Sequence, residues 1–300
     1  MSPGDAQVVD VGGRPVRLTH LDRVIYPATG TTKAEVVDYY ARIAHVLLPQ
    51  LRDRPVSRKR FPQGVGATGP GATFFEKNVP GGAPTWVRRQ TIPAEPEDEG
   101  STRIEFPFVD DVAGLVWLAN LSALELHTPQ WRVGPRGAFK GVDRLVVDLD
   151  PGTGAGLAEC ASVAHLVAER LGDDGLDTVP VTSGSKGMQL YAPWPARAAR
   201  AHGSTRDYAK ALAEQLARDH RRLVVSDMKK TLRSGKVLVD WSQNHLAKTT
   251  VTPYSLRGRE LPRVAAPRAW AEVGDDLEQL SPWEVLERVD SVGDLMAALR

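Results

Sequence analysis

The chain has 300 residues, of which 42% are hydrophobic and 25% are charged, and its formal net charge is +1. This composition is typical of a globular protein with a substantial core, and the single cysteine, Cys160, excludes an internal disulfide and a cysteine-rich zinc site. No apolar run approaches the roughly 20 residues that span a bilayer, and the N-terminus lacks a signal-peptide pattern, so we expect a cytoplasmic protein without membrane contacts.

Charge is unevenly distributed along the chain, although the total is close to zero. Arg58–Arg60 is a tight basic cluster, and residues 221–236 contain six basic side chains against one acid, Asp227. Basic residues also dominate 248–268, whereas acidic residues concentrate at 95–99. Local basic surfaces of this kind suit a polyanion, because neutralised phosphates release counterions. For any single cluster, an ordinary solvated face is an equally good interpretation.

The N-terminal part of the chain predicts an arm followed by a capped helix. Residues 1–20 fit a short strand or arm. Thr32 and Glu35 can form a capping box, and the apolar residues that follow recur at helical spacing. Pro49 is expected to end this helix, because a proline ring disrupts the preceding turn.

Two further segments complete the first half. Residues 62–84 are rich in glycine and proline and predict a long irregular loop, which carries the adjacent Phe74 and Phe75. Bulky aromatic side chains in a loop need either a core that buries them or a ligand on which they stack. The apolar segment 112–127 predicts a helix that ends at His127.

The second half alternates predicted strands and helices. In chain order we expect a strand at 145–150, a helix at 157–171, strands at 178–181 and 188–191, a helix at 204–219, a strand at 236–241 and one or two short helices after 281. A break near residue 140 is expected to divide a single domain into an N-terminal lobe (1–140) and an α+β catalytic lobe (141–300).

Three aspartates in this half suggest a metal site. Asp148 and Asp150 point the same way at the end of one strand, because side chains alternate between the faces of a sheet. Two close carboxylates repel each other unless a cation compensates, and Asp240 on another predicted strand can supply a third oxygen ligand. Two divalent ions held this way would promote in-line attack on an α-phosphate. An Asp-x-Asp pair can also be solvent-facing, can cap a turn, or can bind a metal and a nucleotide-sugar in a glycosyltransferase.

A second set of residues suits a triphosphate. Ser183–Gly187 (Ser-Gly-Ser-Lys-Gly) is a small-residue turn between two predicted strands, where successive backbone N–H groups can form an anion nest and Lys186 adds charge. It is not a Walker motif, because the spacing and the following helix are missing. Arg257 and Arg259 can add charge-assisted hydrogen bonds. A plain hairpin turn and surface arginines are the alternative interpretation.

Ordered motifs over residues 15–290 resemble a known family. They are Asp22–Pro27 with Thr31–Lys33, Arg58–Arg60, Phe74–Lys77, Leu124–Arg132, Val147–Pro151, Thr182–Gly187, Val239–Asn244 and Pro253–Arg259. In them the chain resembles the polymerase domain of bacterial ligase D, the non-homologous end-joining repair enzyme, and the stand-alone homologues of that domain. These proteins belong to the archaeo-eukaryotic primase superfamily.

The resemblance implies a primase-polymerase fold, with mixed and antiparallel sheets flanked by helices and an RRM-like catalytic lobe. It also implies that Asp148, Asp150 and Asp240 bind two Mn²⁺ (or Mg²⁺) ions. The implied nucleotide-binding residues are His127, Ser183, Lys186, Gln189, Gln243 and Arg257. Gln189 departs from the superfamily pattern, which has a histidine there, so we expect a weaker or altered grip on the triphosphate.

The same resemblance implies contacts with DNA. Arg23, Lys33 and Lys59 would bind the 5′-phosphate beyond a gap, with Arg23 replacing a lysine that a relative may carry. Phe74 and Phe75 would stack on a template base, although the residues by themselves favour burial under the loop. The implied activity is addition of nucleotides, preferably ribonucleotides, to DNA gaps or double-strand breaks, on the nucleoid and with Ku and a DNA ligase as partners. The alternatives are a non-catalytic DNA-end-binding module and the glycosyltransferase.

Overall fold

A six-stranded sheet forms one half of the computed structural model, which describes residues 6–93 and 103–299. Its strands lie in the order β15 (Val224–Val225), β16 (Val237–Asp240), β12 (Arg144–Pro151), β14 (Met188–Pro193), β13 (Val179–Thr182) and β20 (Ala266–Pro267). Neighbours are antiparallel except β15 and β16, which are parallel.

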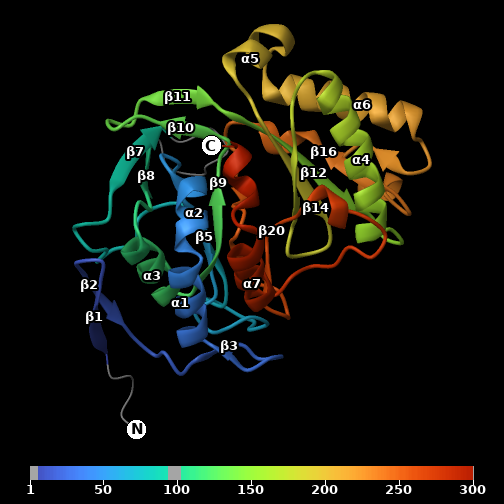
Figure 1. Cartoon of the computed structure of the whole chain (residues 1–300). Coiled ribbons are helices and arrows are strands. Elements are labelled where there is room, and N and C mark those ends of the chain that lie inside the picture. Colours follow the sequence, from blue (N-terminus) through green and yellow to red (C-terminus); the bar gives the residue numbers. More distant parts are fainter. Residues whose placement is uncertain (1–5, 94–102, 300) are drawn as a thin grey trace.

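Two helices cover one face of this sheet (Figure 1). They are α4 (Leu157–Asp173) and α6 (Thr205–Asp219), and both match the predicted ranges. Leu145, Val147 and Leu149 of β12 share one buried core with the apolar faces of these helices. Because side chains alternate along a strand, Asp148 and Asp150 lie on the opposite face of β12, away from the helices.

A four-stranded antiparallel sheet organises the other half. Its order is β17 (Thr250–Val251), β9 (Ala123–Thr128), β5 (Ser57–Arg60) and β6 (Phe74–Glu76). The second core brings this sheet together with α1 (Lys33–Arg42), α2 (Ala44–Leu51), α3 (Val112–Asn120), α7 (Pro282–Val292) and the 3-10 helix Leu295–Leu299. The chain after residue 250 therefore returns to pack against the first half, past the break expected near residue 140.

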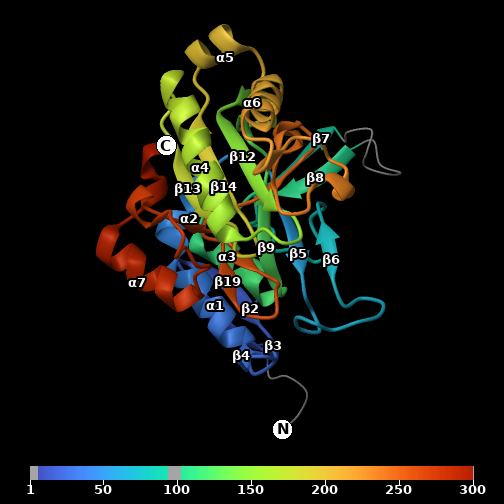
Figure 2. The ribbon, with the colours of Figure 1, turned by 90° about the vertical axis from the view of Figure 1, so that its right-hand side faces the viewer.

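Short hairpins and turns complete the fold. They are β1 (Gln7–Val11) with β2 (Arg14–Leu18), β3 (Val24–Tyr26) with β4 (Thr31–Thr32), β7 (Arg89–Pro93) with β8 (Arg103–Pro107), β10 (Trp131–Val133) with β11 (Phe139–Val142), and β18 (Leu256–Arg257) with β19 (Arg263–Val264). Helix α5 (Ala196–His202) and 3-10 turns at Lys230–Leu232, Trp241–Asn244 and Trp270–Glu272 connect the larger elements. Figure 2 shows β6 and the β7–β8 hairpin on the same side of the molecule.

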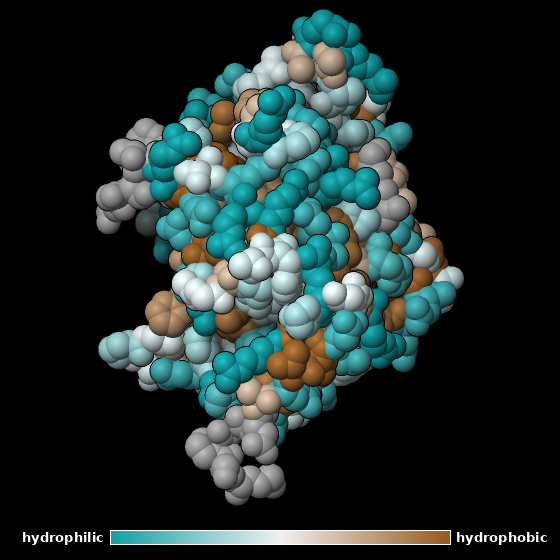
Figure 3. All heavy atoms as spheres, turned by 90° about the vertical axis from the view of Figure 1, so that its left-hand side faces the viewer, coloured by the Kyte–Doolittle hydropathy of each residue, from teal (hydrophilic) through white to brown (hydrophobic). Residues whose placement is uncertain are grey.

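The surface and the fold class agree with the composition. On the face shown in Figure 3, hydrophobic residues occur as separate patches among hydrophilic ones. None of the helices in 6–93 and 103–299 combines the length and the hydropathy needed to cross a bilayer. The α+β class predicted from the sequence is confirmed, whereas the acidic run at 95–99 lies outside the described residues.

Two predicted helices are corrected. The capping box of Thr32 and Glu35 is present, but α1 ends at Arg42, and Pro49 lies inside the following helix α2 rather than ending it. Pro49 leaves one helix carbonyl without its N–H partner and strains the preceding turn, yet the helix forms because Val46, Leu47 and Leu51 are buried.

The predicted helix at 112–127 stops at Asn120, and His127 lies on strand β9. Ser122 adopts a left-handed φ of 57° that turns the chain, and the apolar run beyond it is buried between β5 and β17. A continuous apolar run does not distinguish a buried strand from a buried helix. In the same way, Phe74 and Phe75, expected in a loop, form strand β6 beside β5.

Candidate active site

Strand register brings the three predicted aspartates together. Asp148 of β12 pairs directly with Asp240 of β16, and Asp150 lies two residues further along the same face. Like charges directly opposite each other on antiparallel strands are destabilising unless something compensates them. Burial in the first place, and then the neighbouring charges of Asp240 and Asp150, raise the pKa of Asp148 to about 7.

Each of these carboxylates already has polar neighbours. Gln189 donates to Asp148 through Nε2 at 3.0 Å, and the Tyr191 hydroxyl donates to Gln189 Oε1 at 3.1 Å. Arg233 lies 3.6 Å from Asp150. The backbone and hydroxyl of Ser242 donate to Asp240 Oδ1 at 2.9 and 2.6 Å, and Gln243 donates to its Oδ2 at 3.2 Å.

The donor set suits a hard divalent cation, although it is not a closed metal site. Among residues 6–93 and 103–299, no group of three His, Cys, Asp or Glu side chains is arranged to hold a metal by itself. The raised pKa of Asp148 reflects its burial and the nearby charges of Asp240 and Asp150. Mg²⁺ and Mn²⁺ prefer oxygen ligands and fill the remaining positions with water and substrate phosphate. A site of carboxylates that leaves coordination positions open therefore suits these ions.

The turn between β13 and β14 packs tightly against β12. A Cβ atom at Gly187 would lie 2.0 Å from the carbonyl oxygen of Leu149, and one at Gly184, whose φ is +65°, would lie 2.6 Å from Arg257 Cγ. The Gln279 amide holds both ends of the turn, accepting from the Gly184 N–H at 2.6 Å and donating to the Gly187 carbonyl at 3.0 Å.

This arrangement engages part of the backbone that the predicted anion nest would use. The Gly184 N–H donates to Gln279, and the Ser185 N–H donates to the Ser183 hydroxyl at 3.2 Å. Two of the successive N–H groups are therefore already engaged. The exposed Lys186 lines the cleft together with Ser183, Ser185 and Gly187 of the turn.

One cleft collects every predicted catalytic and nucleotide-binding residue. It has a volume of about 470 Å³ and is lined by polar side chains of both sheets. Its lining includes Asp148, Asp150, Asp240, His127, Ser183, Lys186, Gln189, Gln243, Arg257 and Arg259. Carboxylates and cations thus face one common space.

A buried ionic network supports one wall of the cleft. Glu125 accepts from His127 Nε2 at 2.9 Å and from the Gly258 N–H at 3.1 Å, and Arg257 Nε lies 3.6 Å away. Burial opposes ionisation of Glu125, but the hydrogen bond from His127 and the charge of Arg257 lower its pKa to about 2. An ionised Glu125 can only accept, so the proton of a neutral His127 lies on Nε2 and Nδ1 is the acceptor.

Phe74 and Phe75 do not share one environment. Phe75 pairs with Lys59, and its ring lies 5.4 Å from the ring of His127. Phe74 follows the strand alternation and points to the other face. Both are exposed, Phe74 by 40% and Phe75 by 51%.

Arg23 and Lys33 lie near each other at a separate cation cluster. Lys33 is buried and donates to the Thr19 carbonyl at 2.6 Å. Burial, and then the charges of Arg23 and Arg60, lower the pKa of Lys33 to about 8. Arg23 donates to the Pro62 carbonyl at 2.7 Å. Lys59 instead lies opposite Glu125 on the neighbouring strand and faces the cleft network.

Four residues that contact the predicted site residues were not predicted from the sequence: Glu125, Tyr191, Arg233 and Gln279. Glu125 had a signal, since alternation along Glu125-Leu-His127 puts it on the same face as His127 once the segment is taken as a strand. The contacts of Gln279 join residues more than 90 positions apart and leave no local pattern.

Comparison with known proteins gives a consistent result. Residues 32–296 match the family model described as LigD, primase-polymerase domain. The chain is 47% identical over 287 residues to the multifunctional non-homologous end joining protein LigD of Mycolicibacterium smegmatis, covering 95% of this chain and 36% of that protein. It is 31% identical over 262 residues to the bifunctional non-homologous end joining protein LigD of Bacillus subtilis, covering 87% of this chain and 40% of that protein.

A solved structure agrees over nearly the full length. The polymerase domain from Mycobacterium tuberculosis ligase D in complex with DNA superposes with a TM-score of 0.86 at 47% identity, covering 95% of this chain and 97% of that one. The chain thus spans a little over a third of the curated M. smegmatis relative but almost all of this excised domain.

Proposed function

The chain belongs to the LigD primase-polymerase family of nucleotidyltransferases, and from this membership we propose that it extends a DNA end or fills a short gap with nucleotides during double-strand break repair. The observation that carries the proposal is the single cleft in which the three aspartates face Ser183, Lys186 and Arg257. Carboxylates that can hold divalent cations lie beside cations that can hold a triphosphate, which is the combination that nucleotidyl transfer needs.

In this proposal, Lys186, Arg257 and Arg259 bind the triphosphate, and the Ser183 hydroxyl donates to a phosphate oxygen. Arg257 is fixed in place, because it donates to the Ser183 carbonyl at 2.5 Å and lies beside Glu125. At the other end of the cleft, His127 Nδ1 accepts a hydrogen bond from a hydroxyl of the nucleotide or primer, and Gln243 contacts the sugar or base. Fixed donors and acceptors of this kind lower the barrier without reorganising during the reaction.

Asp148, Asp150 and Asp240 would hold two divalent ions, Mn²⁺ or Mg²⁺. When bound, such ions lower the pKa of the attacking hydroxyl and stabilise the leaving pyrophosphate. The chain's own contribution is to keep the three carboxylates at one strand end. Gln189 and Tyr191 orient Asp148, and Ser242 orients Asp240.

Contacts with DNA extend the proposal beyond the cleft. Lys33 and Arg23, with Lys59 nearer the cleft, bind a downstream 5′-phosphate, and Phe75 stacks on a base close to His127. Phe74 on the opposite face serves a different part of the template strand. We also propose a preference for ribonucleotides, action at the nucleoid in the cytoplasm, and cooperation with Ku and a DNA ligase, as expected for an end-joining polymerase.

A gap-filling assay tests the core of the proposal. The protein is incubated with Mn²⁺, a labelled nucleoside triphosphate and a gapped duplex bearing a 5′-phosphate. Wild type should extend the primer, and Asp148→Ala should lose extension by at least about a thousandfold while DNA affinity changes less than about threefold, because the charge it loses contacts metal rather than DNA. Tight DNA binding by wild type without extension would leave only an end-binding role.

A further inference from the structure

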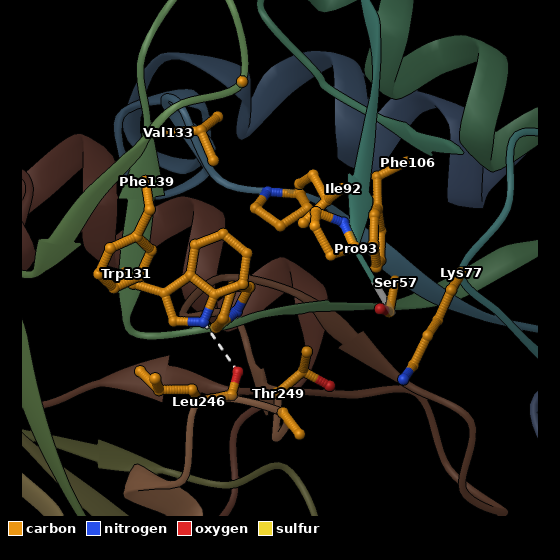
Figure 4. A pocket seen from close by; sticks show the side chains of 14 residues that line it. Ser57, Lys77, Ile92, Pro93, Phe106, Trp131, Val133, Phe139, Leu246 and Thr249 are labelled. Atoms are coloured by element: carbon orange, nitrogen blue, oxygen red, sulfur yellow. Dashed lines mark hydrogen bonds between the residues drawn. The ribbon is translucent and has the colours of Figure 1, made fainter. Parts of the chain in front are cut away.

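A second cavity, of about 450 Å³, lies beside the cleft and has a different character (Figure 4). Its walls are mainly apolar and aromatic. The β7–β8 hairpin contributes Ile92 and Phe106, and the β10–β11 hairpin contributes Trp131 and Phe139. Figure 4 shows Ser57 and Lys77 across the cavity from Trp131 and Phe139. Apolar walls with a few polar groups are typical of a ligand pocket.

One polar group in this cavity lacks a partner. Ser57 is 0% exposed, and its hydroxyl makes no hydrogen bond to any residue of the described chain. A buried hydroxyl without a partner loses its hydration with no compensation. A ligand that offers a hydrogen-bonding edge would restore that interaction.

The cavity is contiguous with the nucleotide cleft. Thr249 lines both spaces. Ser57 of β5 pairs directly with His127 of β9, so their side chains lie next to each other on the same face of the sheet. Ser57 lines the apolar cavity and His127 lines the cleft. The apolar cavity therefore begins at the His127 end of the cleft, away from Lys186 and the phosphate turn.

The aromatic wall is held in place and reaches the surface. Trp131 Nε1 donates to the Leu246 carbonyl at 2.8 Å, and the rings of Trp131 and Phe139 are 5.7 Å apart. Phe139 is 57% exposed. The neighbouring Lys140 and Lys248 are also exposed. Lys248 donates to the Ser242 hydroxyl at 2.6 Å. Aromatic side chains that reach the surface are typical of sites that bind single-stranded nucleic acid by base stacking.

We propose that this cavity receives one unpaired base of the template strand, turned out of the stack next to the base that directs insertion. The inference rests on the proposed function, because it requires a template across the cleft. A strand-borne base fits better than a second free nucleotide, since the lining contains Lys77 but no set of groups comparable to Lys186, Arg257 and Arg259 for a triphosphate. The base stacks on Trp131, its edge faces Ser57, and its phosphate stays outside the cavity.

The test combines single abasic sites in the template with a variant that fills the cavity. Ala247 lines the cavity, so Ala247→Phe occupies it without removing a polar group. Ala201→Phe on the exposed surface of α5 is the matched control. DNA affinity is measured by fluorescence anisotropy without nucleotide, for templates with an abasic site at each position around the templating base.

For wild type and Ala201→Phe, the abasic site next to the templating base should weaken binding about tenfold, as loss of one stacked base does. For Ala247→Phe the same abasic site should change affinity less than about twofold, because the cavity is already filled. Ser57→Ala should weaken binding of the intact template about threefold, consistent with one lost hydrogen bond.

An equal abasic penalty in wild type and Ala247→Phe overturns the proposal, and so does an abasic scan without a peak at this position. If Ala247→Phe lowers the melting temperature, the Ser57→Ala result decides, since that variant removes only an unpartnered oxygen. Extension of a primer on a template that ends at the templating base is measured separately. Failure of that extension would count against the proposed polymerase function, while the binding scan would still decide whether the cavity holds a base.

Discussion

In the catalytic cleft each of the three aspartates contacts a polar or basic side chain, whereas Lys33 donates to a backbone carbonyl beside two further cations, of which Arg60 is paired with Glu76 at 2.9 Å. Asp148, Asp150 and Asp240 are met by Gln189, Arg233 and Ser242. Lys33 has the Thr19 carbonyl, and the neighbouring charges of Arg23 and Arg60 help to lower its pKa. The carboxylates are thus oriented before substrate binds, while an anion bound at the cation cluster would favour the charged form of Lys33. This difference predicts which substitutions affect catalysis and which affect affinity and pH dependence.

The Asp148–Asp240 pair places like charges directly opposite each other on neighbouring strands, and neutralising it should give the largest effect. Asp240→Asn keeps the Oδ1 acceptor for Ser242 but removes a charge opposite Asp148. Extension should fall at least about a thousandfold. Without metal, the variant should be more stable than wild type by roughly 0.2–1 kcal/mol, since cross-strand repulsion is relieved.

Thermal melting with and without Mn²⁺ measures this, with Asp290→Asn on exposed α7 as the control for loss of a surface charge. Mn²⁺ should raise the melting temperature of wild type and of the control more than that of Asp240→Asn. Equal stabilisation of all three proteins by Mn²⁺ would contradict Asp240 as a ligand.

Substitution of Glu125 tests the ionic network of Glu125, His127 and Arg257 next to the cleft. Glu125→Gln keeps the shape of the side chain but removes the charge that faces His127 and Arg257. The free energy of unfolding should therefore fall by about 1.5–3 kcal/mol, the usual contribution of a hydrogen bond to a charged group. The pKa of Glu125 in the folded protein, about 2, is below its ordinary value of 4.5. The stabilisation is therefore complete above about pH 4.5 and is lost as the pH falls toward 2.

Urea unfolding of wild type and Glu125→Gln at several pH values measures this difference. The gap between the two proteins should be widest near pH 6 and should shrink below pH 4.5. A gap that stays constant down to pH 3 would show that Glu125 stabilises the fold by packing alone. Glu287→Gln on the exposed side of α7 is the control for loss of a surface carboxylate.

The cation cluster should respond to high pH instead. In the folded protein Lys33 has a pKa of about 8, below its ordinary 10.5, so its charge is lost as the pH rises through about 8. Preference for a 5′-phosphate over a 5′-hydroxyl on the downstream strand should therefore fall several-fold between pH 7 and 9. The ratio of the two dissociation constants is the measurement.

Lys33→Arg provides the matched control, because arginine keeps its charge across this range. Its preference should be nearly flat between pH 7 and 9. If the preference of wild type is also independent of pH, either a bound phosphate keeps Lys33 charged or the phosphate binds elsewhere. A salt titration of Lys33→Met separates these outcomes, since loss of one phosphate contact lowers the salt dependence of affinity by about one unit.

The residues in and around the cleft differ in how far the sequence could predict their positions. Alternation along one strand is a local rule, so the common face of Asp148 and Asp150 followed directly from the sequence. That Asp240 pairs with Asp148 depends on register between distant strands, so the sequence offered Asp240 only as a candidate on another predicted strand. Glu125 and the strand that carries His127 were missed because burial between β5 and β17, rather than local periodicity, selects that strand. Gln279 had no local signal at all.

Substitution of Gln189 should have the smallest effect of these variants, and it tests whether this side chain orients Asp148 or binds the triphosphate. Family resemblance predicts histidine at this position and a weaker hold on the triphosphate by glutamine. The structure adds that Gln189 is fixed at both ends, donating to Asp148 and accepting from the Tyr191 hydroxyl. Gln189→His can reach a phosphate with a chargeable donor but loses part of this arrangement.

We therefore expect Gln189→His to lower the KM for nucleotide by about two- to threefold, consistent with one improved hydrogen bond, with kcat nearly unchanged. Tyr191→Phe is the paired variant, because it frees the Gln189 amide without touching the cleft. It should lower kcat modestly and leave the KM alone, since Asp148 rather than the triphosphate loses its orientation. A histidine variant with an unchanged KM would mean that Gln189 acts on Asp148 only, and that the triphosphate is held by Lys186, Arg257 and Arg259 without it.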